Sequence, residues 1–332
     1  MQKVKRYRNS LRAGRLLLRT LVFKPNKGKI FSDQKTLRGT SYDLYEPIGS
    51  TKGIHMMVYG LDYAGEKDPR LVHFAKAYVD SGFRVAIPKL PGLKSFAFEI
   101  GDVERIGDLI SSLHRQYGFP IRITAFSVGA GLALVALSQY SFEEEVDLIL
   151  MFSPYYSLPE LWASMSNSKS ITPTNEREMD HFLFGQMALA YQNIESLGLT
   201  ASERTEFLGI LDKYCVLPLT EKKEFYDRVL IGKEIPELCD LSPDVKTLEL
   251  LSPAGKLNNI STRVLIIHDP EDMVFSPEQS RRIILELSQR RVSKGERLLV
   301  TPLLSHVSPR VTLKAFDLLI ILDIIGELFN CT

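Results

Sequence analysis

The sequence predicts an α/β fold with a mostly parallel sheet that is interrupted by a helical insertion. Between residues 39 and 152, short apolar runs alternate with segments of helical spacing, which is typical of strand–helix–strand units. The apolar runs are nearly continuous, as in Val146–Phe152 (VDLILMF), and such runs form parallel strands that are covered on both faces. Residues 155–260 have helical spacing and no convincing strand, and the alternation resumes at residue 264.

The boundaries of each element follow from apolar spacing and from the positions of Gly and Pro. Pro69 and Gly82, for example, bound the first helix of the sheet region. Before the insertion we expect strands at 39–47, 54–59, 83–88, 121–126 and 146–152, and helices at 69–81, 103–117 and 128–140. Within the insertion we expect helices at 180–195, 201–213 and 221–229. After it we expect strands at 264–268 and 296–301 and helices at 277–290 and 309–329.

Composition places the chain among ordinary globular proteins. Of its 332 residues, 45% are hydrophobic and 24% are charged, which excludes collagen-like and wholly disordered chains. Its three cysteines are too few and too scattered for a disulfide framework or a zinc site. We therefore expect a basic N-terminal arm at 1–32, an α/β core at 33–154 and 253–332, and the helical insertion at 155–252.

The N-terminal arm carries an excess of positive charge. Residues 1–32 hold ten Lys and Arg and no acid, whereas the rest of the chain has 31 basic and 40 acidic residues. One helical stripe of the arm is basic, namely Arg8, Arg12, Arg15 and Arg19, and an apolar stripe includes Val4, Tyr7, Leu11, Leu18 and Leu21. This pattern is typical of an interfacial helix that binds an anionic membrane. A helix docked on the acidic body and a mitochondrial transit peptide are the open alternatives.

A serine stands where a predicted strand meets a predicted helix. In the segment Ile123–Gly131 (ITAFSVGAG), the small residues Ala125 and Gly129 lie two positions before and after Ser127. A nucleophile elbow needs small residues there, because its strained turn brings the helix close to the strand. The turn raises the hydroxyl above the carboxyl edge of the sheet, where a helix N-terminus stabilises negative charge. The alternative is a buried serine that caps the helix.

Two later segments supply the groups that activate a serine. Asp269 and Asp272 follow the apolar run at 264–268, and His306 follows the next predicted strand. A serine becomes a good nucleophile when a neutral imidazole removes its proton, and a carboxylate orients that imidazole. The order of serine, acid and histidine along the chain is the one found in α/β hydrolases.

With these residues the chain resembles the α/β-hydrolase fold superfamily over about residues 40–152 and 253–330. Further similarities are Tyr59-Gly60-Leu61, which resembles the oxyanion loop of the family, the segment 82–92 (GFRVAIPKLPG), and the Ser-His-Val-Ser context at 305–308. The resemblance implies a catalytic triad of Ser127, Asp272 and His306. It also implies that the backbone N–H groups of Leu61 and Val128 bind the oxyanion.

Four positions depart from the pattern of the family. Ala125 replaces an elbow glycine, Tyr59 the histidine of the oxyanion loop, Lys89 an acid, and Asp269 the glycine of the acid turn. No departure removes a catalytic group, so together they indicate a divergent subfamily. Asp269 remains a rival of Asp272 for the acid role.

The resemblance implies a serine hydrolase, esterase-like or lipase-like, that cleaves a small-molecule carboxylic ester, with lipid-derived esters among the candidates. An acyltransferase that uses the same triad and a catalytically silent binding protein are the alternatives. The insertion lies where the superfamily places a cap over the nucleophile. The sequence has no phosphate-binding loop, no dinucleotide fingerprint and no metal-ligand spacing of its six histidines. We therefore expect no cofactor, no metal and no nucleic-acid partner.

The sequence also bears on localisation. No segment provides the roughly 20 apolar residues of a transmembrane helix, and no apolar run in the arm has the length of a secretory signal. We expect a cytoplasmic protein, peripheral to a membrane if the arm binds lipid and mitochondrial if the arm is a transit peptide.

Overall fold

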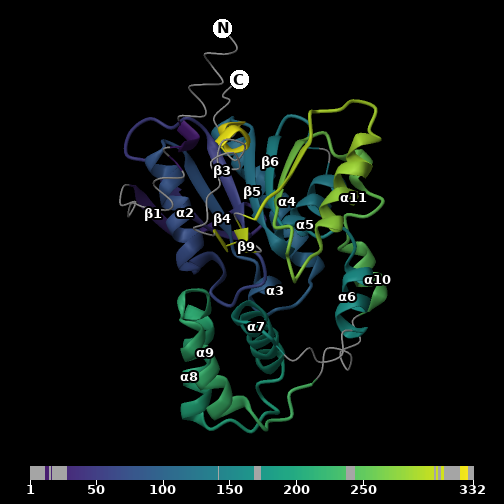
Figure 1. Ribbon diagram of the computed structural model, residues 1–332. Coiled ribbons are helices and arrows are strands. Elements are labelled where there is room, and N and C mark those ends of the chain that lie inside the picture. The colour runs from purple at the N-terminus through teal and green to yellow at the C-terminus, as the bar shows by residue number, and fades with distance from the viewer. Residues whose placement is uncertain are drawn as a thin grey trace.

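The computed structural model describes residues 12–14, 16, 28–140, 142–167, 173–236, 244–302, 304–305, 308–309 and 322–327. Its main feature is an eight-stranded sheet in the order β1-β2-β4-β3-β5-β6-β7-β8 (Figure 1). The first two strands pair antiparallel, and β2 pairs antiparallel with β4. The strands from β4 across to β8 are parallel. The strands are Lys29–Lys35 (β1), Ser41–Glu46 (β2), Ile54–Val58 (β3), Arg84–Pro88 (β4), Ile121–Phe126 (β5), Val146–Phe152 (β6), Arg263–His268 (β7) and Arg297–Val300 (β8).

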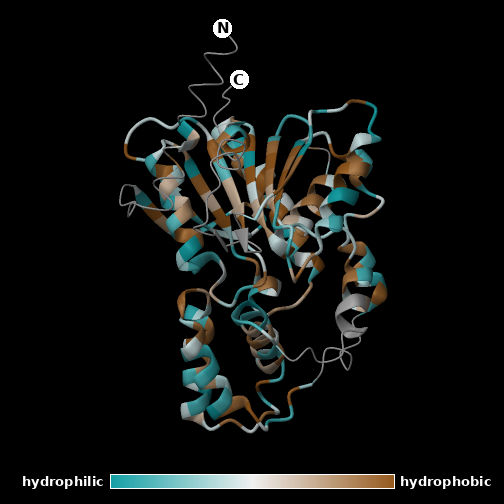
Figure 2. Cartoon of the chain, viewed as in Figure 1, coloured by the Kyte–Doolittle hydropathy of each residue, from teal (hydrophilic) through white to brown (hydrophobic). Residues whose placement is uncertain are grey.

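Helices connect the strands and cover the sheet. They are Pro69–Asp80 (α2), Pro91–Lys94 (α3), Ile100–Tyr117 (α4), Ser127–Gln139 (α5) and Pro277–Ser288 (α11). Every residue of β3 is buried, and α5 is buried from Ser127 to Leu137, so these elements lie in the interior. Figure 2 shows the apolar residues gathered on the strands of the sheet. The predicted fold class, a mostly parallel sheet with covering helices, is confirmed.

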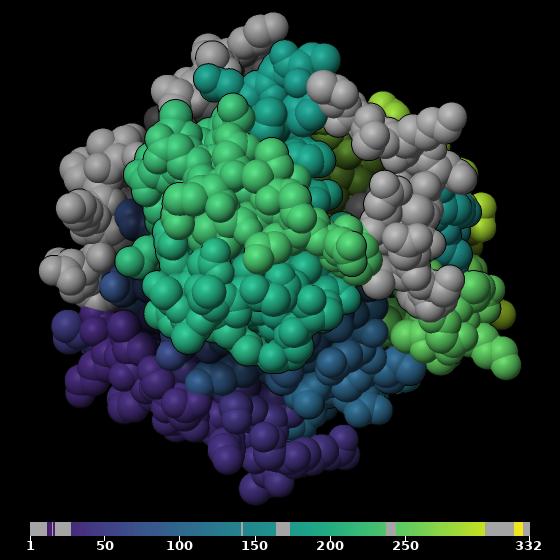
Figure 3. Space-filling model, turned by 90° about the horizontal axis from the view of Figure 1, so that it is seen from below, coloured from purple at the N-terminus to yellow at the C-terminus, as the bar shows by residue number. Residues whose placement is uncertain are grey.

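Between β6 and β7 the described residues form helices and no strand. They are Leu158–Asn167 (α6), Glu176–Gln192 (α7), Ala201–Lys213 (α8), Leu219–Phe225 (α9) and Val245–Leu250 (α10), with a π-helical turn at Tyr226–Leu230. The helices α7, α8 and α9 share an apolar cluster of their own, built around Leu183, Met187, Phe207, Leu211 and Phe225. They lie beyond the carboxyl edge of the parallel strands and cover it in the view from below (Figures 1 and 3).

Part of the N-terminal arm packs against the core. Residues 12–14 and 16 are helical, and the side chains of Ala13 and Leu16 are fully buried in the main apolar cluster together with Ile324 and Ile325. The short helix at 322–327 lies at the edge of the sheet away from the insertion (Figure 1). These contacts favour a docked helix for this part of the arm, whereas most of the basic and apolar stripes lie outside the described residues.

Several elements differ from the sequence-based expectation. The helices α3, α6 and α10 were not predicted. Strand β1 was not predicted, because it is an edge strand whose residues are almost all exposed and so show no alternation of apolar and polar residues. The last helix was predicted to begin at Pro309, which is wrong. Ser308–Pro309 (β10) pairs with Leu304–Ser305 (β9), because a proline, which fixes φ and lacks an N–H, suits an edge strand as well as a helix start.

A membrane-spanning helix would need length and an apolar sequence together. Among the described residues, no helix combines the two.

Candidate functional site

Ser127 occupies the sharp turn between β5 and α5. Strand β5 ends at Phe126, and the helix begins at the serine itself. The backbone of Ser127 has φ of +51°, a left-handed conformation that is rare outside glycine. Such a conformation persists only where the surrounding structure holds it, and it is common at active sites.

Close packing around the turn explains the small residues beside Ser127. A Cβ atom added to Gly129 would lie 1.9 Å from the backbone oxygen of Tyr59. One added to Gly60 would lie 2.9 Å from the Cβ of Ser127, and one added to Gly131 would lie 2.1 Å from the ring of Tyr155. The loop after β3 and the segment after β6 therefore pack directly on the first turns of α5.

The predicted oxyanion residues lie on these two packed segments. Leu61 follows Gly60 in the loop after β3, and Val128 is the second residue of α5, where backbone N–H groups have no partner within the helix. Tyr59 anchors the loop, because its hydroxyl accepts a hydrogen bond from the N–H of Leu90 at 2.7 Å. The residue that replaces the histidine of the oxyanion loop thus has a structural contact of its own.

The predicted acid lies at the same edge of the sheet as Ser127. In the register of the parallel strands, Phe126 lies beside Phe152, and Phe152 lies beside Ile267. Strands β5 and β7 therefore end level, separated by two strand spacings of about 4.8 Å each. Asp272 follows β7 after a short turn, so the structure brings its loop and the serine to one edge.

Hydrogen bonds fix the side chain of Asp272. It is fully buried, and its Oδ1 accepts bonds from the N–H groups of Val274 at 2.8 Å and Phe275 at 3.0 Å. Its Oδ2 lies 3.5 Å from Nε2 of His268. The imidazole of His268 also contacts the hydroxyl of Ser280 and the carbonyl of Phe275, so this histidine belongs to the framework of the acid turn.

Solved structures are similar to this chain in overall fold at low sequence identity. An acylaminoacyl peptidase of Pyrococcus horikoshii has a TM-score of 0.54 and 14% identity, over 95% of this chain and 42% of that chain. A puromycin-hydrolysing peptidase of Mycobacterium tuberculosis has a TM-score of 0.53 and 14% identity, over 89% and 37%. TT1662 from Thermus thermophilus has a TM-score of 0.52 and 12% identity, over 92% and 100%. The chain has the α/β-hydrolase fold.

The two peptidases are longer proteins, and the chain spans about two fifths of their length. No protein-family model matches the sequence, and no curated protein is significantly similar to it. The similarity to solved structures therefore establishes the α/β-hydrolase fold, and the chemistry of the site has to be argued from the residues themselves.

His306, the third member of the predicted triad, lies outside the described residues. The two short strands β9 and β10 flank it in the sequence, and β9 lies at the level of the core that faces the insertion (Figure 1). Ser127, Asp272 and strand β9, which ends one residue before His306, are thus on the insertion side of the α/β-hydrolase sheet. The roles of the site residues stay predictions.

Asp269 has a partner that the sequence did not reveal. Its Oδ2 lies 2.7 Å from Nη2 of Arg177, which projects from the first turn of α7 in the insertion. Asp269 is fully buried in this ion pair. No sequence motif marks Arg177, because its contact with the acid turn depends on how the insertion folds over the α/β-hydrolase core.

A cluster of potential metal ligands lies next to the oxyanion loop. In the described part of the chain, Asp62, Asp68 and Cys215 have ligand atoms within 4.8 Å of one another. Arg70 already supplies a positive charge there, at 2.8 Å from Asp68 and 3.4 Å from Asp62. Burial and the neighbouring carboxylate raise the pKa of Asp62 to about 7, and burial raises the pKa of Cys215 to about 12. This cluster joins the core to the insertion without needing a metal.

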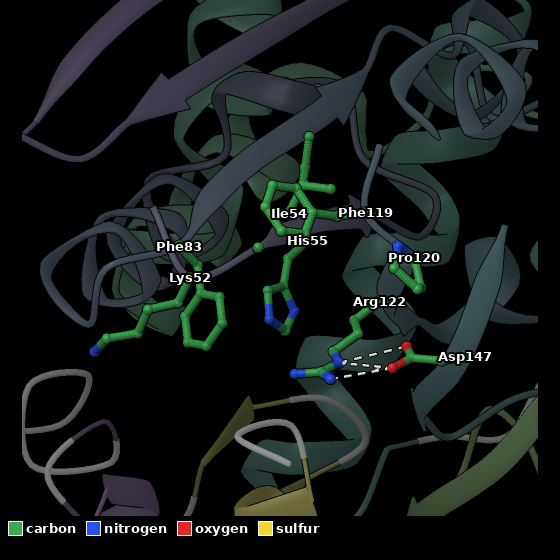
Figure 4. A pocket seen from close by; sticks show the side chains of 9 residues that line it. Lys52, Ile54, His55, Phe83, Phe119, Pro120, Arg122 and Asp147 are labelled. Atoms are coloured by element: carbon green, nitrogen blue, oxygen red, sulfur yellow. Dashed lines mark hydrogen bonds and ion pairs between the residues drawn. The ribbon is translucent and has the colours of Figure 1, made fainter. Parts of the chain in front are cut away.

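A small pocket lies at the opposite, amino edge of the sheet. Its volume is about 100 Å³, and His55, Phe83, Arg122 and Asp147 are among the residues that line it (Figure 4). The buried ring of His55 lies edge-on to Phe83 at 4.7 Å, and burial lowers its pKa well below the usual value. Arg122 pairs with Asp147 at 3.0 Å. This pocket is separate from the edge that carries Ser127.

We predict that Gly129→Ala destabilises the protein by about 1–3 kcal/mol, the usual range for overpacking, because the new methyl group would overlap a backbone oxygen. Gly185→Ala is the matched control. Gly185 lies in α7, and an added Cβ would have no neighbour within 4 Å, so a gain of up to about 1 kcal/mol is expected. Urea unfolding measures both. Equal stability of Gly129→Ala and wild type would contradict the close packing.

We predict that Asp62→Asn changes how stability depends on pH. The folded chain keeps the proton of Asp62 up to about pH 7, whereas the unfolded chain releases it near pH 4. The folded state therefore loses stability through this group as the pH rises from about 4 to 7. Asn cannot ionise, so Asp62→Asn avoids this loss. The difference in free energy of unfolding between Asp62→Asn and wild type should therefore shift in favour of the variant as the pH rises over this range.

The matched control for this experiment is Asp68→Asn. Asp68 pairs with Arg70 and accepts a hydrogen bond from its N–H at the start of α2, so its loss should destabilise the protein at both ends of the range. Urea unfolding at pH 4.5 and 7.5 gives the two differences. A constant difference between Asp62→Asn and wild type would show that Asp62 is ionised throughout.

Proposed function

We propose that the protein is a serine hydrolase that cleaves a carboxylic ester through an acyl-enzyme intermediate. The observation that carries this proposal is the left-handed backbone of Ser127 at the β5–α5 turn. A helix-capping serine, the alternative interpretation, does not require that strain. The strained turn instead presents a hydroxyl at the carboxyl edge of the sheet, where α/β enzymes bind their substrates.

In the proposed mechanism, Ser127 is the nucleophile. Its Oγ attacks the acyl carbon while His306 removes its proton, and the same histidine then protonates the leaving alcohol. Water, activated in turn by His306, cleaves the acyl-enzyme and releases the acid. Asp272 orients the imidazole and stabilises its protonated form, a role that suits a carboxylate held by two backbone N–H groups.

The oxyanion of the tetrahedral intermediate would be bound by backbone groups. We assign this role to the N–H groups of Val128, in the first turn of α5, and Leu61, in the adjoining loop. The positive end of the helix dipole adds to the effect. Because packing fixes both segments before the substrate arrives, no reorganisation is needed as the charge develops.

The insertion would act as a cap that shapes the substrate site. Leu61 contacts both the core cluster and the insertion cluster. A groove of about 570 Å³ lies between core residues, including Tyr63, and insertion residues, including Tyr191 and Leu208. The groove is also lined by Ser95, by Gln192 and by the ion pair of Arg204 with Glu195, so the proposal of a small ester rests on the sequence resemblance and not on the groove.

The names of the similar structures bear on the leaving group. Two of them are named as peptidases, and peptidases cleave amides by the same acyl-transfer chemistry. We propose an ester because the sequence resemblance is to esterases and lipases. A panel of p-nitrophenyl esters from acetate to palmitate, together with an acylamino-acid p-nitroanilide, tests the two leaving groups and the chain length.

We predict that Ser127→Ala abolishes ester turnover and labelling by a fluorophosphonate probe while the protein stays folded. The loss should be on the order of 10⁴–10⁶-fold, as for other triads, and His306→Ala should be about as damaging. The double variant should be hardly worse than either, because the residues act as a unit. Retention of more than about a tenth of wild-type turnover by Ser127→Ala would mean that the nucleophile is wrongly assigned.

We predict that Asp272→Asn is far more damaging than Asp269→Asn. Loss of the carboxylate that orients the imidazole lowers turnover by about 10⁴-fold in comparable triads. Asp269 is already paired with Arg177 at 2.7 Å, so it is the less suitable partner for a histidine. Steady-state kinetics on the best ester compares the two variants, and the reverse order would move the acid role to Asp269.

A further inference from the structure

Arg177 links the insertion to the turn that carries the proposed acid. From the first turn of α7 its Nη2 lies 2.7 Å from Oδ2 of Asp269, and its Nη1 lies 3.4 Å from Oε2 of Glu271. The first contact is well shielded, because Asp269 is fully buried and the side chain of Arg177 is 21% exposed. A shielded ion pair of this kind is much more sensitive to the loss of one partner than an exposed pair.

Asp269 is also part of the acid turn itself. Its Oδ1 accepts a hydrogen bond from the N–H of Glu271 at 3.1 Å, and its backbone oxygen accepts one from the N–H of Asp272 at 3.2 Å. Asp269 therefore closes the turn from 269 to 272 through its backbone oxygen, while its carboxylate binds both the N–H of Glu271 within the turn and the arginine of the insertion. In the family that the sequence resembles, a glycine at this position provides no such side chain.

We propose that Arg177 is a positioning residue for the acid. It holds the turn at 269–272 in place from the insertion, so that Asp272 keeps the orientation that its role toward His306 requires. This inference rests on the proposed function, since it takes Asp272 as the acid of the triad. It means that the insertion completes the catalytic geometry as well as covering the substrate.

The chemistry of the pair explains why Arg177 would matter. Arg177→Ala takes a cation away from a fully buried carboxylate, and a buried carboxylate then favours a rearrangement that brings it closer to water. The turn that would move also carries Asp272. Lysine at position 177 would keep the charge but could not present two donors in a fixed fork to Asp269 and Glu271. Arg177→Lys should therefore hold the acid turn in place only in part.

The first test is steady-state kinetics on the best p-nitrophenyl ester. We expect Arg177→Ala to lower kcat on the order of 10²-fold, the usual scale for a small misplacement of catalytic groups, while KM changes little. Arg177→Lys should lie between wild type and Arg177→Ala. The double variant Arg177→Ala/Asp269→Gly removes the buried charge together with its partner and should be more active than Arg177→Ala alone.

The matched control is Arg282→Ala. Arg282 in α11 pairs with Glu160 in α6, so its loss also breaks an ion pair between core and insertion, but this pair does not involve the acid turn. We expect Arg282→Ala to lower the melting temperature slightly and to keep the wild-type kcat. A fall in kcat as large as that of Arg177→Ala would overturn the positioning role.

The second test does not depend on catalysis. The N–H groups of Val274 and Phe275 bond to Asp272, so hydrogen–deuterium exchange of residues 269–275 reports on the acid turn. Exchange of these residues should be faster in Arg177→Ala than in wild type. In the double variant it should be slower than in Arg177→Ala, and in Arg282→Ala it should equal that of wild type. Unchanged exchange in folded Arg177→Ala, or wild-type kcat in that variant, would overturn the inference.

Ser127→Ala separates this inference from the proposed function. If Ser127→Ala keeps its turnover, the proposed function fails, and kcat no longer reports on a triad acid. If Ser127→Ala is inactive and Arg177→Ala has wild-type kcat, the function stands and the inference about Arg177 alone fails.

Discussion

The loop after β3 lies so close to the first turn of α5 that no side chain fits between them. Gly129 meets the backbone oxygen of Tyr59, and Gly60 meets the Cβ of Ser127. This contact holds Ser127 in a conformation that costs roughly 1–3 kcal/mol for a residue other than glycine. The burial of nearly the whole of α5 offsets that cost, and the same contact sets the proposed oxyanion loop beside the serine.

Two of the four departures from the family pattern follow a common logic. Tyr59 replaces a histidine and binds the backbone of Leu90 through its hydroxyl, which fixes the loop. Asp269 replaces a glycine and binds Arg177 of the insertion, which fixes the acid turn. In each case a larger polar side chain ties a loop of the candidate site to a neighbouring segment, so the site is held by contacts particular to this chain.

The sequence predicted the interior of the fold better than its edges. Strands β5 and β6 have the predicted bounds, because a continuous apolar run between polar or turn residues marks a buried strand. Strand β1 is exposed on the edge of the sheet and carries no such signal. For the candidate site, too, the sequence predicted local features and missed a contact between distant segments. The serine turn has a local pattern that can be read, whereas Arg177 reaches Asp269 across 92 positions, and no local pattern encodes that contact.

The insertion has an apolar cluster separate from that of the sheet, with Phe207, Leu211 and Phe225 at its centre. Substitutions inside one cluster therefore disturb the other through the few residues that touch both, such as Leu61, and through ion pairs such as that of Arg177 with Asp269. Natural selection can thus alter the insertion, and with it the shape of the groove, while the sheet and the serine turn are preserved. Divergence of this kind would leave the backbone fold recognisable long after the sequences of related proteins had ceased to resemble one another.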